Sequence, residues 1–298
     1  MLKPPRLRRG DTVSVIAPAG PVNPEEMQPG LARLESMGYR LLLAPHLYER
    51  KDYLAGDDQV RLDDLHAAFL NPDVRAVICA RGGYGTLRLL PRIRFAAVRR
   101  NPKILVGYSD ITSLLLAVHK KTGLVTFHGP MIRECSKKGS ANLEGMIRRI
   151  SFKGPSRVDL TGADVLKEGR AEGRLIGGNL SLLSRLVGTR YLPDPKGAIL
   201  FVEDLGEQLY RIDRMLTHLK LCGFLGKLSG IVAGRFEDCG DPSRIGELLQ
   251  EAVSDLPIPV VSRAPFGHGD ENETMPIGVR AVLDTGRMSL KWTESPLA

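Results

Sequence analysis

The chain has 298 residues, of which 43% are hydrophobic and 26% charged, ordinary proportions for a folded globular protein. At roughly 100–200 residues per domain, this length predicts two domains or one large one. The first twenty residues hold no apolar segment of the secretory type, and no stretch approaches the ~18 apolar residues that a membrane span needs. We therefore expect a cytoplasmic protein without a membrane partner.

The net charge of +8 at pH 7 suits an anionic small substrate. Basic residues are spread along the chain, with one local excess at 133–157 that lacks the aromatic residues a single-strand nucleic-acid binder uses for stacking. We interpret that segment as a solvated linker and expect no nucleic-acid partner. The four cysteines show no zinc-site spacing, so we expect neither a metal nor a cofactor.

The first half alternates between strand and helix patterns. Apolar runs at 11–20, 39–45, 74–85 and 101–110 predict strands, and the segment 24–39 predicts a helix despite its internal proline. Continuous apolar strands separated by helices indicate a parallel sheet that is covered on both faces. An open doubly wound sheet fits this pattern, and its ligands would lie at the carboxyl ends of the strands.

A basic, weakly periodic stretch from about 137 to 165 is the best candidate for a domain boundary. We predict an N-terminal α/β domain at 1–140, a linker at 141–165, and a smaller C-terminal α/β domain at 166–298. The C-terminal part again mixes strand and helix patterns.

A candidate nucleophile, Ser109, follows the strand predicted for 104–106. Apolar residues at 111, 114, 115 and 118 then repeat at the spacing of one helix face. Ser109 therefore lies at a sharp strand-to-helix turn, where its hydroxyl is raised above the sheet and the N–H of Asp110 can stabilise an oxyanion. The alternative is that Ser109 only caps the helix, because GYSD is not the GxSxG motif.

Two adjacent glycines, Gly82 and Gly83, follow the strand predicted for 74–80. Adjacent glycines let the backbone approach a ligand and offer N–H groups to a negative oxygen. In a parallel sheet, this loop and the Ser109 turn emerge at the same edge. A dinucleotide-binding loop fails on its spacing, because the third glycine would have to stand at Arg88. A plain tight turn remains an alternative.

His128 and His268 are the two histidines in glycine-bearing loops, where an imidazole can act as the base that a serine nucleophile needs. His268 is the stronger candidate because Gly267 and Gly269 flank it, although a role in turn geometry alone stays open. His128 would instead shape the edge of the pocket. We interpret the other four histidines as structural or solvent-facing.

Glu203 stands at the end of a buried-type strand at 198–202. A carboxylate in that place can accept the second ring N–H of the base and hold its tautomer. Asp204 and Glu207 are alternatives, and Glu207 is more typical of a charge at a helix start. A solvated charge at a strand end remains the other interpretation of Glu203.

With these residues in place, the chain resembles the LD-carboxypeptidases, which include the murein tetrapeptide carboxypeptidases. The matching stretches run in family order over nearly the whole chain, and they are specific together although not singly. They are VSVIAPAGPV, ICARGGYGTLRLL, ILVGYSDIT, GLVTFHGPM, GRLIGGNLSLL, LFVEDLGEQLYRIDRML, GIVAGRF and GHGDENETMPIGVRAVLD.

The resemblance implies a Ser-Glu-His triad, which falls on Ser109, Glu203 and His268. It also implies an oxyanion hole formed by the backbone N–H groups of Gly83 and Asp110. Such an enzyme would be a hydrolase of the serine carboxypeptidase type.

The resemblance further implies a substrate cleft, with Gly178 and Asn179 of the GGNL turn in its lining and Gly82 at the glycine loop. The family fold is an N-terminal flavodoxin-like domain, a doubly wound parallel sheet, followed by a smaller C-terminal α/β domain, with the site between them. Its members are commonly homodimers, and we expect the same here.

The family cleaves the bond between an L-centre, such as that of diaminopimelate or lysine, and a terminal D-alanine in peptidoglycan fragments recycled inside the cell. A related branch protects cells against microcin C-type peptide–nucleotide conjugates, in longer proteins with an aromatic residue that stacks on the base. The only tryptophan here, Trp292, is near the C-terminus, and no extra loop is evident, so the murein substrate is favoured. A substrate-binding protein with a degenerate hydrolase fold is a third hypothesis.

Overall fold

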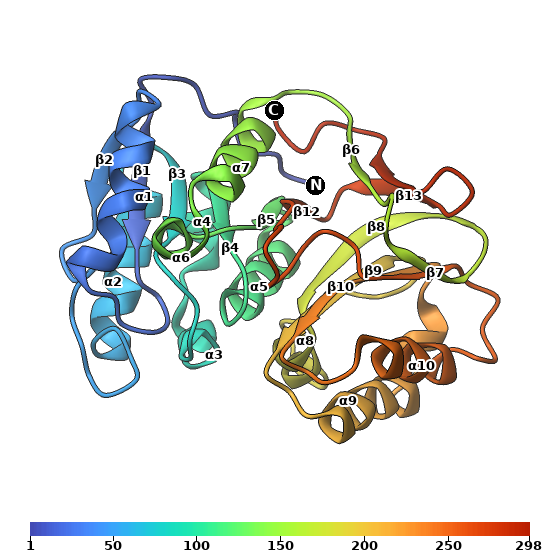
Figure 1. Ribbon diagram of the computed structural model, residues 1–298. Coiled ribbons are helices and arrows are strands. Elements are labelled where there is room, and N and C mark those ends of the chain that lie inside the picture. Colours follow the sequence, from blue (N-terminus) through green and yellow to red (C-terminus); the bar gives the residue numbers. More distant parts are fainter.

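The structure is a computed structural model that describes residues 1–298, except for the side chain of Lys137. The chain forms two sheets that lie beside each other, each accompanied by helices (Figure 1). No helix among the residues described has both the length and the apolar character that crossing a bilayer takes.

The first sheet has the strand order β12-β5-β4-β3-β1-β2. Its strands from the first half pair in parallel, and their order is that of flavodoxin-like folds, which confirms the predicted fold class. These strands are β1 (Thr12–Ile16), β2 (Arg40–Leu43), β3 (Val74–Cys79), β4 (Ile104–Gly107) and β5 (Thr126–His128). The edge strand β12 (Met275–Ile277) comes from the far end of the chain and pairs antiparallel with β5.

The helices of the first half form two groups: α1 contacts α6 and η2, whereas α2, α4 and α5 contact one another in series. The helix α1 tolerates its internal proline because four of its residues are buried against neighbouring elements. The elements are α1 (Pro24–Ser36), α2 (Asp58–Leu70), α3 (Thr86–Leu89), η1 (Leu90–Arg92), α4 (Phe95–Arg100), α5 (Ile111–Thr122), η2 (Ile132–Glu134) and α6 (Cys135–Lys138).

The second sheet has the order β6-β14-β13-β8-β9-β10-β11-β7. Its central strands β8 to β11 are parallel, and antiparallel strands flank them on both sides. The strands are β8 (Arg170–Asn179), β9 (Ile199–Leu205), β10 (Gly230–Glu237), β11 (Val260–Ser262), β13 (Arg280–Asp284) and β14 (Ser289–Trp292). The accompanying helices are α8 (Leu180–Leu186), α9 (Leu209–Leu221), η3 (Leu225–Lys227) and α10 (Pro242–Ala252).

The segment 141–165, expected as a linker, carries regular structure: the helix α7 (Ala141–Ser151), the strand β6 (Ser156–Asp159) and the start of β7 (Asp164–Lys167). The helix forms because four apolar residues recur at helical spacing and are buried, namely Leu143, Met146, Ile147 and Ile150. The basic residues that suggested a solvated segment lie among them in sequence. The domain limits themselves stay a prediction.

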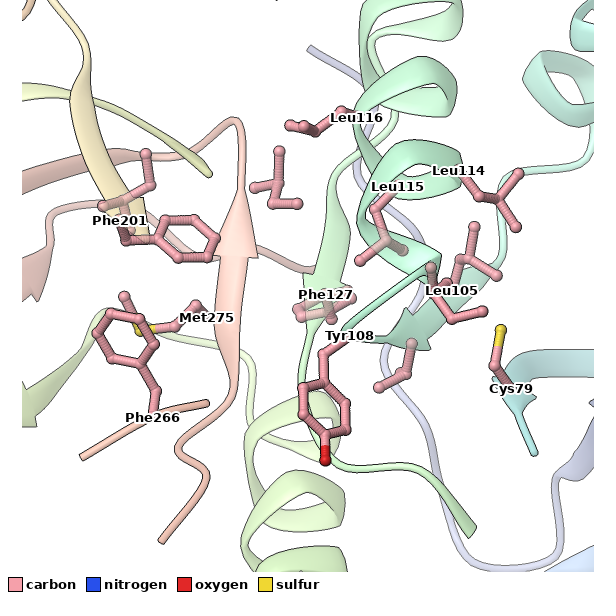
Figure 2. Close-up of a cluster of buried hydrophobic side chains, with 14 of the residues drawn as sticks. Cys79, Leu105, Tyr108, Leu114, Leu115, Leu116, Phe127, Phe201, Phe266 and Met275 are labelled. Atoms are coloured by element: carbon pink, nitrogen blue, oxygen red, sulfur yellow. The ribbon is translucent and has the colours of Figure 1, made fainter. Parts of the chain in front are cut away.

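One apolar cluster runs through both halves of the molecule (Figure 2). Phe127 of β5 lies near Met275 of β12, and beyond them are Phe201 of β9 and Phe266. The rings of Phe201 and Phe266 meet edge to face, with 5.8 Å between their centroids. The core is therefore continuous across the two sheets, and it fixes the carboxyl ends of β4 and β9 near each other.

Candidate active site

Ser109 lies at the tight turn between β4 and α5, as the sequence predicts. Its φ of 61° is in the left-handed region, which is uncommon for a residue with a side chain and is frequent at functional turns. The N-cap residue of α5 is Asp110, so Ser109 is not the cap of the helix. The turn instead holds the serine at the wall of a cavity.

The glycine loop touches the side chain of Ser109 directly. A Cβ atom added at Gly82 would lie 2.8 Å from Ser109 Cβ and 2.9 Å from its Oγ. Any residue but glycine would therefore push the hydroxyl away. Gly83 follows in the same cavity wall, so both predicted glycines stand beside the serine.

Asp110 ties the glycine loop to the serine turn. Its buried carboxylate accepts the backbone N–H of Thr86 at 2.9 Å, and its carbonyl accepts the Thr86 hydroxyl at 2.6 Å. Burial raises the pKa of the Asp110 carboxyl, and the hydrogen bonds from Thr86 oppose that rise. The carboxylate of this helix-start residue therefore reaches across to the neighbouring loop.

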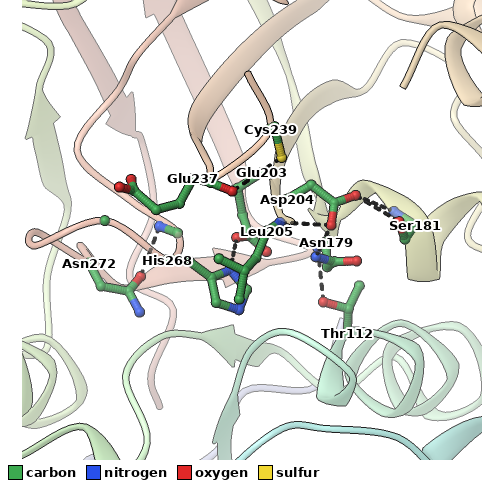
Figure 3. Close-up of polar contacts among 12 residues, drawn as sticks. Thr112, Asn179, Ser181, Glu203, Asp204, Leu205, Glu237, Cys239, His268 and Asn272 are labelled. Atoms are coloured by element: carbon green, nitrogen blue, oxygen red, sulfur yellow. Dashed lines mark hydrogen bonds and ion pairs between the residues drawn. The ribbon is translucent and has the colours of Figure 1, made fainter. Parts of the chain in front are cut away.

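His268 and Glu203 form a buried pair from the second half of the molecule. Glu203 stands near the end of β9, and its Oε2 is 2.5 Å from His268 Nδ1 (Figure 3). Gly267 makes this approach possible, because its φ is +107° and a Cβ there would lie 2.8 Å from Glu203 Cβ. The side chain of Glu203 is fully buried, and that of His268 is 10% exposed.

The two groups stabilise each other's charged forms. Burial disfavours a charged imidazole, but the charge of Glu203 and its hydrogen bond outweigh burial, so the pKa of His268 lies above its ordinary value of 6.5. Burial likewise acts against the Glu203 carboxylate, and His268 reverses that effect, so the pKa of Glu203 is lowered. With Nδ1 held by Glu203, Nε2 has no hydrogen bond to any of the described residues.

Ser109 and His268 line one cavity of about 510 Å³, although they come from different halves of the chain. Gly82, Gly83 and Asn179 are also in its lining. Glu203 is not, because it lies behind the imidazole ring. Five of the eight predicted site residues thus line one cavity, and Glu203 contacts it through its hydrogen bond with His268.

Asn179 lies at the start of α8, where its amide Nδ2 donates to Asp204 at 2.8 Å (Figure 3). Its backbone N–H donates to the Thr112 hydroxyl of α5 at 3.0 Å. Gly178, in contrast, packs against Thr112 and is not in the cavity lining, since a Cβ there would lie 2.6 Å from that side chain. The predicted GGNL turn therefore presents Asn179 to the cavity and uses Gly178 for close packing.

The two alternative carboxylates have other partners. Asp204 accepts the backbone N–H and the hydroxyl of Ser181, at 2.9 and 2.8 Å. Its pKa is raised to about 6 by burial and by the charge of Glu203. Glu207 lines the cavity, and its Oε1 is 3.1 Å from the Ser181 hydroxyl oxygen, so the two carboxylates share the single proton of that hydroxyl. Neither has a hydrogen bond with His268.

His128 does not shape the edge of the pocket, contrary to our expectation. It is fully buried at the end of β5, 5.4 Å from the Phe201 ring, and neither ring nitrogen has a hydrogen-bond partner among the described residues. Burial lowers its pKa to about 4. The short TFHGP loop predicted in the sequence is the continuation of a strand into the core, which explains the difference.

Sequence reasoning missed the part of the cavity that comes from the segment 131–138. Glu134 of this segment lines the cavity, and burial raises the pKa of its carboxyl. Tyr108, next to Ser109, was missed as well; the centroid of its ring is 4.6 Å from that of the His268 ring. The ammonium group of Lys138 donates to the backbone carbonyls of His268 and Gly269. Charged side chains in a segment that looked like a basic linker gave no local signal of these contacts.

Among the described side chains, no group of three or more histidines, cysteines or carboxylates is arranged to hold a metal ion.

Comparison with known proteins gives a consistent picture. The family models described as LD-carboxypeptidase N-terminal domain and LD-carboxypeptidase C-terminal domain match residues 13–129 and 172–283. A probable murein peptide carboxypeptidase of Bacillus subtilis is 39% identical over 95% of this chain and 92% of its own length.

Two solved structures extend the comparison. The muramoyltetrapeptide carboxypeptidase of Oxalobacter formigenes has a TM-score of 0.84 and 34% identity, over 95% of this chain and 99% of that one. MccF, solved in complex with glutamyl sulfamoyl guanosine, has a TM-score of 0.94 and 27% identity over the whole of both chains. MccF of Escherichia coli is a microcin C7 self-immunity protein, 29% identical over 97% of this chain and 95% of its own length. Since both halves match the family models and the relatives match along almost the full length, this chain belongs to the LD-carboxypeptidase family.

Proposed function

We propose that the protein is a serine carboxypeptidase that cleaves the L,D-peptide bond before the terminal D-alanine of peptidoglycan tetrapeptides. The observation that carries the proposal is the cavity that Ser109 and the Glu203-bonded His268 line together. The names of the B. subtilis and O. formigenes relatives support the choice of a muropeptide as the substrate.

In this proposal, Ser109 Oγ attacks the carbonyl carbon of the residue before D-alanine while His268 Nε2 takes the hydroxyl proton. The backbone N–H groups of Gly83 and Asp110 stabilise the tetrahedral oxyanion; one such donor contributes on the order of 3–4 kcal/mol in comparable sites. His268 then protonates the leaving amine of D-alanine. A water molecule, deprotonated by His268, hydrolyses the acyl ester and restores Ser109.

The test is mass spectrometry of defined muropeptides incubated with the purified protein. The wild type is expected to release D-alanine from an L,D-terminated tetrapeptide, and Ser109→Ala is expected to fold normally and release none. Ser136→Ala is the matched control, because its exposed hydroxyl bonds only the Arg133 carbonyl and its loss leaves the site intact. D-alanine release by Ser109→Ala at a near wild-type rate would refute the proposal.

A second candidate substrate is a peptide–nucleotide conjugate of the microcin C type. The observation that favours it is the close structural similarity to MccF, whose solved complex contains glutamyl sulfamoyl guanosine. Incubating the protein with each substrate side by side separates the two. We expect the tetrapeptide to be cleaved with the higher kcat/KM, and the opposite order would assign the protein to the conjugate.

The resemblance to the family carries two further parts of the proposal. The enzyme would act in the cytoplasm, on fragments taken back into the cell, and it would form a homodimer. Sedimentation equilibrium of the purified protein tests the second part, with twice the chain mass of 32.7 kDa as the expected result.

A further inference from the structure

Three cationic side chains from the first half of the chain line the cavity. They are Arg81, Arg133 and Lys138. The Lys138 ammonium is already engaged by the His268 and Gly269 carbonyls. The two arginines have no such role in holding the proposed triad, and their guanidinium groups keep donors to spare.

Arg81 immediately precedes the glycine loop. Its only described hydrogen bond is from Nη1 to the Pro21 carbonyl at 3.1 Å, whereas a guanidinium has five N–H donors. A Cβ added at Gly83 would lie 3.7 Å from Arg81 Nη2, and one added at Gly82 would lie 2.9 Å from Ser109 Oγ. The guanidinium therefore stands next to the same short loop that touches the proposed nucleophile.

Arg133 adds a second guanidinium to the cavity lining. Its Nη2 pairs with Glu26 at 2.6 Å, and its Nε is buried without a partner among the described residues. Burial and the charge of Arg133 lower the pKa of Arg81, while Glu26 is the carboxylate that opposes them. Glu26 pairs directly with Arg133 alone, so the guanidinium of Arg81 has no carboxylate partner among the described residues. Three carboxylates also line the cavity: Glu134, next to Arg133 in the chain, and Asp204 and Glu207 from the second half. The positive charge is therefore local to the two guanidinium groups.

We propose that Arg81 and Arg133 form the subsite for the carboxylate of the substrate's terminal residue. This inference rests on the proposed carboxypeptidase function. In a peptide, the terminal carboxyl carbon is less than about 4 Å from the carbonyl carbon of the bond to be cleaved. A carboxylate bound beside Gly82 and Gly83 thus places the scissile carbonyl at Ser109. Planar guanidinium groups bind carboxylates through paired, charge-assisted hydrogen bonds, so the subsite selects a free chain end.

The experiment compares two tetrapeptide substrates, one with a free C-terminal carboxylate and one with a C-terminal carboxamide. The wild type is expected to prefer the free acid in kcat/KM by about 10- to 100-fold, the range of a hydrogen-bonded charge. In Arg81→Gln this preference is expected to shrink toward one, through loss on the acid and little change on the amide. Arg81→Lys keeps the positive charge but lacks the planar guanidinium group, so its preference for the free acid should lie between those of the wild type and Arg81→Gln.

Arg50→Gln is the matched control, because Arg50 adds positive charge near Arg81 but is not in the cavity lining. Its acid preference should stay within about twofold of the wild type, as expected for a screened charge. Arg133→Gln also breaks the pair with Glu26, so its thermal unfolding is measured alongside its kinetics.

Two results would overturn the subsite while leaving the proposed function intact. One is a wild type that releases alanine and alaninamide equally well; the other is an Arg81→Gln variant that loses the same factor on both substrates. If the wild type cleaves neither substrate, the carboxypeptidase proposal itself fails and the subsite fails with it.

Discussion

At the scale of single residues, the central feature is the pair of His268 and Glu203. The carboxylate is fully buried and its partner nearly so; neither group would keep its charge there alone. The hydrogen bond of 2.5 Å between Glu203 Oε2 and His268 Nδ1 stabilises the charged form of each group against burial. A base held in this way has a fixed tautomer and a pKa that depends on its partner.

The pH dependence of activity follows from that pair. The imidazole must be neutral to accept a proton, so kcat/KM should fall as the pH drops through the His268 pKa, which lies above 6.5. Glu203→Gln removes the charge that raises this pKa while burial still lowers it. We therefore expect the acid limb of the profile to move to lower pH and kcat to fall by about 100-fold or more.

Glu207→Gln is the control for this profile, because Glu207 lines the cavity and bonds Ser181 without contacting His268. Its acid limb should stay where the wild type has it. A larger loss of turnover in Glu207→Gln than in Glu203→Gln would move the third role of the triad to Glu207.

At the scale of elements, two loops are locked together beside Ser109. Thr86, at the start of α3, donates its hydroxyl to the Asp110 carbonyl and shares a 2.6 Å hydrogen bond with the Ser113 hydroxyl. All three residues are buried, so no water replaces these bonds if they are lost. The lock fixes the distance between the glycine loop and the serine turn.

Thr86→Val tests the lock, because it keeps the volume and the backbone N–H but removes the hydroxyl. Losing the two buried hydrogen bonds of this hydroxyl, to the Asp110 carbonyl and the Ser113 hydroxyl, should lower the free energy of unfolding by about 1–3 kcal/mol. We also expect a drop in kcat of about tenfold with little change in KM, because proposed oxyanion donors would be misplaced. Thermal unfolding and steady-state kinetics measure the two effects.

The control is Thr161→Val, whose hydroxyl bonds Asp159 on the surface and which should change neither quantity. An unchanged kcat in a destabilised Thr86→Val variant would show that the lock serves stability alone.

Local sequence patterns predicted the strand-to-helix turns well, because a buried apolar run followed by a helical repeat leaves little choice of structure. Ser109 and the strand that carries Glu203 were found in this way. The helix α7 was missed, since its apolar face is short and basic residues interrupt it. The buried position of His128 was missed as well, because a three-residue strand gives almost no periodic signal.

Contacts between distant residues had no local signal at all. Lys138 is 130 positions from the His268 carbonyl that it binds, and Asp110 is 24 positions from Thr86. Such pairs depend on how the sheets pack, which propensity and spacing do not encode. Lys138 and Thr86 were therefore not among the candidates that the sequence offered, whereas their partners His268 and Asp110 were.

At the scale of the whole molecule, the loop that carries His268 is held by the opposite half of the chain. Asn142 of α7 donates to the Asp270 carbonyl at 2.8 Å and accepts the Asn272 N–H at 3.2 Å. Asn272 in turn accepts the N–H of Gly267 at 3.1 Å. The imidazole is therefore positioned by both halves.

Asn142→Ala should loosen this loop. Losing two hydrogen bonds, one of them exposed, is expected to cost about 1–2 kcal/mol and to speed amide hydrogen exchange across residues 267–272. Turnover should fall several-fold in parallel. Asn101→Ala is the control, because it removes only the hydrogen bond from the Asn101 amide to the Ala97 carbonyl at the end of α4. Equal exchange rates across residues 267–272 in the two variants would contradict this role for Asn142.

The strand β12 restricts how the two halves of the chain can be exchanged between related proteins. It lies after His268 in the chain, yet it closes the edge of the first sheet beside β5. A fragment that ends before it would leave backbone N–H and C=O groups along the edge of β5 unpaired, and such edges recruit foreign strands. The first sheet is thus completed by a strand that follows the central strands of the second sheet in the chain, and shuffling the two halves between relatives would have to carry β12 along with its sheet.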